Sequence, residues 1–278
     1  MLPRLSRCFS SSPSIHPTAF LHPNAVVHPS ARIGPFCAVG QDVEIQQNVH
    51  LKSHVVVSGR TTIGARTKVF SHAVIGTESQ DKKESGRRTA THIGSDCTIR
   101  EFVSVNRGTT HSTTIGSSVH LLANVHVGHD CTIEDSVVIS NGTCLAGHVS
   151  VGWGAIIGGL CGIKQRVRIG QLAMVGGASA VDFDVIPYGL VVGNRAVLRG
   201  INLVGLKRNK TCRKEIQVLL SSQRYLYGVT RSATSFAPAL NLPDHACFQH
   251  RQKELHDAME SGKYGNVRLC RDMLNFLT

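Results

Sequence analysis

The chain has 278 residues, of which 41% are hydrophobic, 17% charged and 5% aromatic, enough for one substantial core and an appendage. No apolar run approaches the roughly 20 residues that a membrane-spanning helix needs. The net charge of +12 favours an acidic partner, because a basic surface speeds encounter with a negatively charged one. The low aromatic content and the lack of a recognisable nucleic-acid-binding module argue against nucleic acid.

The first ten residues are basic, rich in serine and free of acids, and the first acidic residue of the chain is Asp42. This composition is typical of an organellar transit peptide. We therefore expect residues 1–10 to be a presequence outside the fold, and the protein to be mitochondrial, on the matrix side. A disordered N-terminus in a bacterial or cytosolic protein is the alternative.

Aliphatic residues recur at every sixth position over most of residues 11–189, in the runs 15–75, 93–105 and 115–181. A helix would repeat near 3.6 residues and a single strand near 2. A period of six is instead a signature of a parallel β-helix. Three units make a coil of about 18 residues, and successive coils stack at about 4.8 Å, the spacing of paired strands.

Four cysteines occupy the small inward-facing site that recurs four residues after the aliphatic one: Cys37, Cys97, Cys131 and Cys161. No CxxC pair occurs among the nine cysteines of the chain. The spacing thus argues against a disulfide framework and a structural zinc site, and predicts buried, reduced thiols.

Two interruptions break the period. The polar stretch 77–91 must leave the β-helix as an external loop, which we call the first excursion. A shorter, second excursion spans residues 108–114. Loops on a rigid scaffold are common carriers of function. After Pro187 the six-residue period ends. Residues 190–278 are predicted to form a helical domain that caps the end of the β-helix. Its amphipathic segments lie at 214–227, 249–261 and 267–277.

The segment around His129 and Asp130 places an imidazole beside an acid. Such a pair suits a general base, because the acid fixes the tautomer and orientation of the histidine. Steps of 18 residues from His129 lead to a column of further polar positions on the same edge: Gly147, His148, Lys164 and Gln165. A corner-glycine N–H such as that of Gly147 could face a developing oxyanion. The combination favours acyl transfer to a hydroxyl.

These residues resemble the UDP-N-acetylglucosamine O-acyltransferase family, whose members catalyse the first step of lipid A synthesis. The resemblance covers nearly the whole chain after the presequence and weakens beyond about Thr211. It is carried by Ile33–Cys37, Leu51–Val57, Gln80–Lys83, His126, His129–Cys131, Leu145–Ser150, Ala155–Gly159 and Gly205–Arg208. The hexad repeat alone is shared by many acyltransferases, whereas these segments together are specific.

The resemblance implies a mainly β fold: a left-handed parallel β-helix of hexapeptide repeats, followed by a C-terminal α-helical domain. It implies a homotrimer with active sites between subunits. An R-3-hydroxyacyl chain would move from acyl carrier protein to the 3-hydroxyl of UDP-N-acetylglucosamine, with no cofactor beyond the phosphopantetheine of the carrier.

The same resemblance assigns roles to individual residues. His129 would be the general base, Asp130 its support and the Gly147 N–H the oxyanion donor. The residues that would line the cleft are His126, His148 and Gln165. Those that would hold the sugar nucleotide are Gln80, Asp81 and Lys83. Nucleotide or phosphopantetheine groups would be bound by Asn202 and Arg208. Gly177 matches the position that limits acyl length, where glycine leaves room for a longer chain.

Three positions depart from the family pattern. Lys164 and Asn106 stand where histidine is common, and Val204 replaces a glutamate. The base itself is intact, so we expect the reaction class to hold and the nucleotide contacts, including those near Lys164, to be rearranged.

Three alternatives remain at this stage. A γ-type zinc carbonic anhydrase shares the β-helix and would need His120, His126 and His129 to meet between subunits around zinc. A scaffold that has lost catalysis would be missing the base. A sister N-acyltransferase would act on an acylated amino sugar.

Overall fold

The computed structural model describes residues 14–82, 87–227, 245–261 and 268–277. Two predictions fall outside this part of the chain: the presequence at residues 1–10 and Lys83, predicted to bind the sugar nucleotide. The chain divides into two compact units, residues 1–131 and residues 132–278, and each is described by itself.

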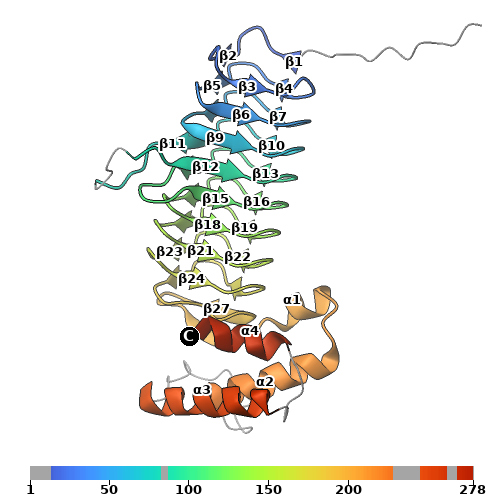
Figure 1. The fold of residues 1–278 in the computed structure, drawn as a ribbon, viewed down its shortest axis with the longest axis vertical. Helices are drawn as coiled ribbons and strands as arrows, with labels where there is room; N and C mark the ends of the chain where they lie inside the picture. The colour runs from blue at the N-terminus through green and yellow to red at the C-terminus, as the bar shows by residue number, and fades with distance from the viewer. Residues whose placement is uncertain (1–13, 83–86, 228–244, 262–267, 278) are drawn as a thin grey trace, which may run out of the picture. The chain divides into compact units, whose positions relative to one another are not determined.

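The first unit is a parallel β-helix whose short strands stack coil upon coil (Figure 1). Its first sheet contains β1 (Ser14–Ile15), β4 (Arg32–Ile33), β7 (His50–Leu51), β10 (Lys68–Val69), β13 (Thr98–Ile99) and β16 (His120–Leu121). Its second sheet contains β2 (Phe20–Leu21), β5 (Ala38–Val39), β8 (Val56–Val57), β11 (Val74–Thr77), β14 (Ser104–Asn106) and β17 (His126–Val127). Its third sheet contains β3 (Val26–Val27), β6 (Val43–Ile45), β9 (Arg60–Ile63), β12 (Ala90–Ile93) and β15 (Thr113–Ile115).

The register confirms the predicted coil length. Ile33 pairs with Leu51, and Leu51 with Val69, each 18 residues apart. Val69 pairs with Ile99 across the first excursion, and Ile99 with Leu121 across the second. Each excursion therefore adds residues to one coil without shifting the aliphatic position that follows, which keeps the core continuous through this unit.

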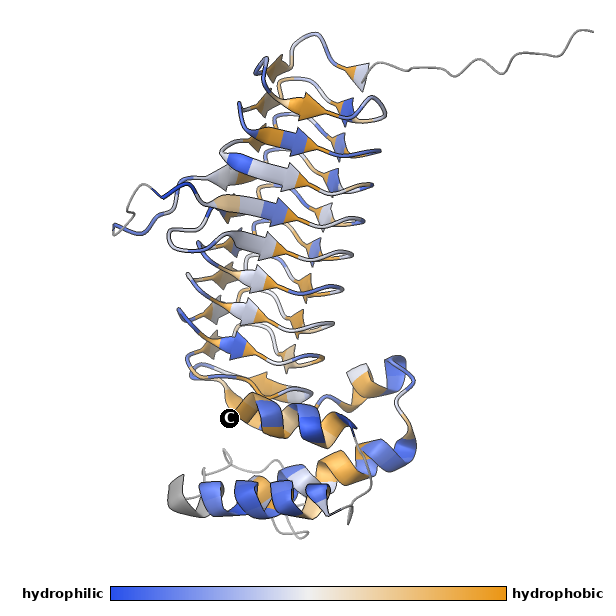
Figure 2. Cartoon of the chain, in the orientation of Figure 1, coloured by the Kyte–Doolittle hydropathy of each residue, from blue (hydrophilic) through white to orange (hydrophobic). Residues whose placement is uncertain are grey.

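The aliphatic hexad residues form the core of the coil. Apart from the first coils, where Ile15 is 40% exposed, they are almost fully buried, as are the four cysteines predicted to face inward, none of which forms a disulfide. Figure 2 shows hydrophobic and hydrophilic residues alternating along the strands, as expected where one residue of each pair points inward and the next outward.

Bulky residues occupy the left-handed backbone region at many corners. Phe36, His54, His72 and Phe102 have φ between 56° and 64°. Residues other than glycine seldom adopt this conformation. Here each ring contacts the next, with centroids 4.8 to 5.0 Å apart; His54, His72 and Phe102 are stacked, and Phe36 is tilted by 30° against His54. Ring stacking between successive coils thus accompanies a conformation that disfavours large side chains.

The second unit is also built of short stacked strands and ends in helices. Its strands are β18 (Thr132–Ile133), β19 (Val138–Ile139), β20 (Cys144–Leu145), β21 (Ser150–Val151), β22 (Ile156–Ile157), β23 (Gly162–Ile163), β24 (Arg168–Ile169), β25 (Met174–Val175), β26 (Ala180–Val181), β27 (Gly189–Val192) and β28 (Val197–Ile201). Its helices are α1 (Leu203–Arg208), α2 (Arg213–Tyr227), α3 (His245–Glu260) and α4 (Arg268–Leu277). None of the described helices is long and apolar enough to cross a membrane.

The prediction of a helical domain from residue 190 is wrong in its first part. Strands β27 and β28 form an antiparallel hairpin, so the helices begin only at Leu203. The hairpin lacks the six-residue period, and it turns through Gly193 and bends at Gly200, both at positive φ. The three predicted amphipathic segments correspond to α2, α3 and α4.

The helices pack on the last coil of this unit (Figure 1). Their apolar faces share one buried cluster with that coil, which includes Leu219, Leu226 and Met273 from the helices and Ile186 from the coil. A polar contact supplements the cluster, because the buried Tyr188 hydroxyl lies 2.7 Å from a carboxylate oxygen of Asp272 on α4.

Candidate active site

One edge of the first unit collects both excursions and the predicted base. β11, β14 and β17 are neighbours in the second sheet, and the chain leaves each of them at the same edge. The first excursion follows β11, the second follows β14, and the turn with His129 and Asp130 follows β17. The six-residue register therefore brings together three segments that lie far apart in sequence.

The Asp130 carboxylate is held by the second excursion. One oxygen accepts the N–H and hydroxyl of Thr109 at 2.9 and 2.6 Å. The other accepts the N–H groups of Thr110 and His111 at 2.9 and 2.6 Å, and the Thr110 hydroxyl at 3.1 Å. Successive backbone N–H groups converging on an anion form a nest, here closed around a side chain.

These hydrogen bonds control the charge of Asp130. Burial of the carboxyl raises its pKa, but the hydrogen bonds from Thr109, the His111 N–H and His129 outweigh burial and hold the pKa well below its usual range. Asp130 is therefore a carboxylate at any working pH.

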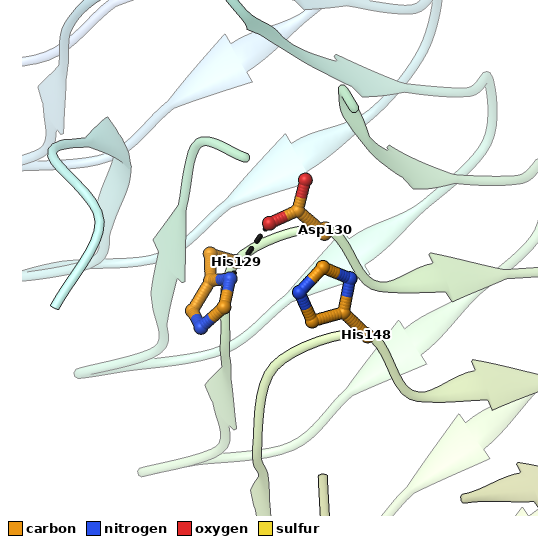
Figure 3. A group of neighbouring side chains, drawn as sticks. All are labelled: His129, Asp130 and His148. Carbon is orange, nitrogen blue, oxygen red and sulfur yellow. Dashed lines mark hydrogen bonds and ion pairs between the residues drawn. The ribbon is translucent and has the colours of Figure 1, made fainter. Parts of the chain in front are cut away.

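The ionised Asp130 fixes the orientation of His129. His129 Nδ1 lies 2.7 Å from Asp130 Oδ2, and both residues are 7% exposed (Figure 3). A carboxylate can only accept hydrogen bonds, so Nδ1 carries the proton and the neutral imidazole keeps its lone pair on Nε2. The pair thus presents a proton acceptor at Nε2, as predicted for a general base. Figure 3 also draws His148, which belongs to the second unit.

The first excursion supplies an acid on the Nε2 side of the imidazole. Asp81 Oδ2 lies 4.0 Å from His129 Nε2, and the Asp81 side chain is 26% exposed. The structure thus brings together Asp81, Asp130 and His129, all predicted as site residues. Gln80, the preceding residue, is exposed on the same loop.

His126 lies in the same region on β17. Its Nδ1 is 2.8 Å from the Ser104 hydroxyl on the neighbouring strand. Burial, and then repulsion from His129 whenever that ring is protonated, lower the pKa of His126, so the neutral ring is favoured. His120, required by the zinc hypothesis, is exposed on a different sheet, the first.

The second unit carries the other corner residues. Gly147 and His148 follow β20, and Lys164 and Gln165 follow β23, whose register pairs Leu145 with Ile163. The predicted stacking of these two turns is confirmed by the hydrogen bond from the Arg166 N–H to the Gly147 carbonyl, 3.1 Å long. His148 is half-buried at φ 61°, whereas Lys164 and Gln165 are exposed.

Family models match three parts of the chain. Residues 112–147 match the bacterial transferase hexapeptide, and residues 184–276 match the UDP-N-acetylglucosamine O-acyltransferase domain 2. Residues 15–113 match the GMPPB C-terminal domain.

Curated relatives and a solved structure give the same family. A Synechocystis acyl-(acyl-carrier-protein)--UDP-N-acetylglucosamine O-acyltransferase is 43% identical over 207 residues, which are 72% of this chain and 74% of the relative. The chain belongs to the UDP-N-acetylglucosamine O-acyltransferase family. The crystal structure of the Moraxella catarrhalis member is 34% identical, with a TM-score of 0.82, and the match covers 94% of this chain and 97% of that one.

Not every alignment is long. A Nautilia profundicola O-acyltransferase is 40% identical over 57% of this chain, but the alignment spans only 62% of that relative. The family is shown by the longer match to the Synechocystis relative.

Asn202, predicted to bind nucleotide or phosphopantetheine groups, has a structural role. Its side chain caps α1 by accepting the Gly205 N–H at 2.9 Å, and its amide donates to the Leu172 carbonyl at 2.9 Å. Arg208, in the last turn of the same helix, is exposed, as is Val204. The structure therefore leaves Arg208 available to a ligand, while the Asn202 amide is already engaged on both sides.

Gly177, predicted to set acyl length, is exposed at a corner of the second unit. A Cβ built there would meet the Gly159 carbonyl at 3.4 Å, an ordinary contact. A side chain at this position would therefore extend outward without disturbing the coil.

Sequence reasoning missed two supports of the site, Thr109 with its neighbours in the second excursion, and Ser104 beneath His126. The signal for the excursion was present, since the aliphatic series shifts by four residues between Val105 and Ile115. Nothing in the sequence indicated that the inserted residues would close around Asp130, because the contact joins residues about 20 positions apart.

Proposed function

We propose that the protein transfers an R-3-hydroxyacyl chain from acyl carrier protein to the 3-hydroxyl of UDP-N-acetylglucosamine, the first step of lipid A-type glycolipid synthesis. One observation carries the proposal. His129 is bound through Nδ1 to an ionised carboxylate, so the lone pair of the imidazole lies on Nε2, which faces Asp81 at 4.0 Å. This geometry suits activation of a hydroxyl for acyl transfer.

In the proposed reaction, a proton passes from the sugar hydroxyl to His129 and from there to the departing thiolate. His129 Nε2 takes the proton of the sugar hydroxyl as its oxygen attacks the thioester carbonyl. The tetrahedral intermediate collapses with cleavage of the carbon–sulfur bond, and the imidazolium returns the proton to the departing thiolate. Asp130 stabilises the imidazolium throughout, because its carboxylate remains charged and hydrogen-bonded.

The other predicted residues take supporting roles in this proposal. The Gly147 N–H would stabilise the oxyanion, and His126 and His148 would line the cleft. Asp81, placed beside Nε2, would bind the sugar close to the hydroxyl that reacts.

We further propose a homotrimer in which neighbouring subunits complete the site, with the acidic carrier protein as partner of the basic surface. The net charge of +12 supports the second part. Light scattering of the purified protein tests the trimer, and a monomer at assay concentration would contradict it.

We also propose that this is an organellar member of the family, delivered to the mitochondrial matrix. The support is compositional: no acidic residue precedes Asp42. Fusing residues 1–41 to a fluorescent reporter in eukaryotic cells tests this, and a cytosolic signal would contradict it.

A substrate matrix tests the activity. Purified protein is incubated with acyl carrier protein loaded with 3-hydroxyacyl chains of several lengths, against UDP-N-acetylglucosamine and its 3-amino and 3-O-acyl analogues. We expect O-acylation of UDP-N-acetylglucosamine to have the highest kcat/KM. Preference for an amino acceptor would favour the N-acyltransferase instead, and stoichiometric zinc needed for activity would favour the anhydrase.

A further inference from the structure

A buried amide joins the two excursions. Asn106, the last residue of β14, is 4% exposed. Its Nδ2 donates to the Thr77 hydroxyl at 3.1 Å and to the Glu78 carbonyl at 2.9 Å. One side chain thus uses both of its N–H groups to hold the point where the first excursion leaves β11.

Backbone contacts reinforce the same junction. The Arg107 N–H donates to the Thr77 carbonyl at 2.8 Å. At the C-terminal end of the first excursion, the Thr89 hydroxyl donates to the Gly108 carbonyl. The Ala90 N–H donates to the hydroxyl of Ser112 in the second excursion. The first excursion is therefore fastened at both ends to the segment that also holds Asp130.

The junction determines where Asp81 lies. Asp81 comes three residues after Glu78, outside any strand, and its carboxylate lies 4.0 Å from His129 Nε2. A residue on a loop keeps its position only if the anchors of that loop are fixed. The Arg107–Glu78 ion pair contributes little, since its atoms are 4.0 Å apart and the Glu78 side chain is 82% exposed.

We propose that Asn106 is a positioning residue for the sugar-nucleotide side of the site: by fixing Thr77 and Glu78 it places Asp81 opposite the reactive nitrogen of His129. The inference rests on the proposed function for its kinetic consequence, but the anchoring itself is independent of it. Asn106 acts through Asp81 and touches no reacting atom.

The same side chain offers a substitution that preserves its shape. Asn106 Oδ1 is buried and, among the described residues, accepts no hydrogen bond. Leucine has nearly the shape of asparagine and would remove this unpaired acceptor together with both donors. Asn106→Leu therefore releases the excursion with little loss of global stability, and Asn106→Asp, which keeps the shape but not the donors, is a second variant.

Limited trypsin digestion measures how firmly the first excursion is anchored. The excursion contains exposed Lys82, Arg87 and Arg88 as cleavage sites. Two ordinary hydrogen bonds correspond to about 10- to 100-fold in an opening equilibrium. We expect cleavage at these sites to be faster by that factor in both variants under native conditions, measured by mass spectrometry of the fragments.

Thr67→Val is the matched control. The Thr67 hydroxyl is fully buried and also makes two hydrogen bonds, to the Gly94 carbonyl at 3.0 Å and from the Cys97 N–H at 3.1 Å, but does not touch the excursion. This variant should lower the Tm and leave cleavage of the excursion at the wild-type rate.

Kinetics then test the positioning role. We expect kcat/KM for UDP-N-acetylglucosamine to fall about 10- to 100-fold in Asn106→Leu, with KM for acyl carrier protein unchanged. Wild-type cleavage rates in both variants would overturn the anchoring. Faster cleavage with unchanged sugar-nucleotide kinetics would overturn the positioning role. An inactive wild-type protein would overturn the proposed function, while the digestion would still decide the anchoring.

Discussion

Asp130→Asn replaces one carboxylate oxygen by an NH2 group, which can take the place of either oxygen. The amide has one accepting oxygen, whereas both Asp130 oxygens receive backbone N–H groups. If the NH2 replaces Oδ2, the Thr109 N–H loses its acceptor and the NH2 points at His129 Nδ1. If it replaces Oδ1, the N–H groups of Thr110 and His111 both lose theirs.

The first orientation loses fewer backbone hydrogen bonds and should dominate. A buried donor without a partner costs about 1–3 kcal/mol. We therefore expect Asp130→Asn to lower the free energy of unfolding by about 2–4 kcal/mol once the lost charge-assisted bond to His129 is included. In this orientation His129 Nδ1 must accept a hydrogen bond, so the proton moves to Nε2 and the base is blocked. The corresponding substitution in serine protease triads lowers kcat about 10⁴-fold for the same reason.

The stability difference should depend on pH. The pKa of Asp130 is lowered in the folded protein, so its stabilisation is fully present above the unfolded value of about 3.9 and declines as pH falls below it. Urea unfolding at pH 7 and near pH 3.5 measures the two free energies, and single-turnover acyl transfer measures the rate. A variant with wild-type kcat and wild-type stability at pH 7 would refute the reasoning.

Three further substitutions give distinct readouts. Gly108→Ala drives a Cβ into the backbone carbonyl of His111 and places it 2.8 Å from Asp130 Oδ1, so we expect the nest to open, with Tm and kcat both reduced; an unchanged Tm in thermal unfolding would contradict this. Gly177→Leu should leave Tm unchanged and shift the preferred acyl donor to a shorter chain, and identical chain-length profiles would argue against a role in length selection. Tyr188→Phe removes the hydroxyl bonded to Asp272, and urea unfolding should show a loss of about 1–3 kcal/mol, whereas no loss would mean that the contact is not stabilising.

The coil could be predicted because its cause is local and repeated. Every coil after the first buries aliphatic residues such as Leu51 at the same places, so the pattern occurs many times in the sequence and one irregular unit does not obscure it. The hairpin formed by β27 and β28 occurs once, and no repeat supports it. Its strands were therefore assigned to the helical domain.

The site was predictable to the extent that it follows the register. His129 and Asp130 are adjacent in sequence, and the 18-residue step correctly related Gly147 to the turn at Lys164. Asp81 came from family resemblance, because its approach to His129 depends on how an excursion folds back. The hydrogen bonds from Thr109 to Asp130 could not be predicted, because an inserted loop has no sequence period and its path is set by contacts with distant residues.

The most direct test is acyl transfer by His129→Ala. If Nε2 of His129 removes the proton of the sugar hydroxyl, the variant should retain the fold, as judged by circular dichroism and Tm, and lose at least about 10²-fold in kcat, the usual contribution of a general base. KM for UDP-N-acetylglucosamine should change little by comparison. A folded His129→Ala protein that transfers the 3-hydroxyacyl chain at the wild-type rate would contradict the account.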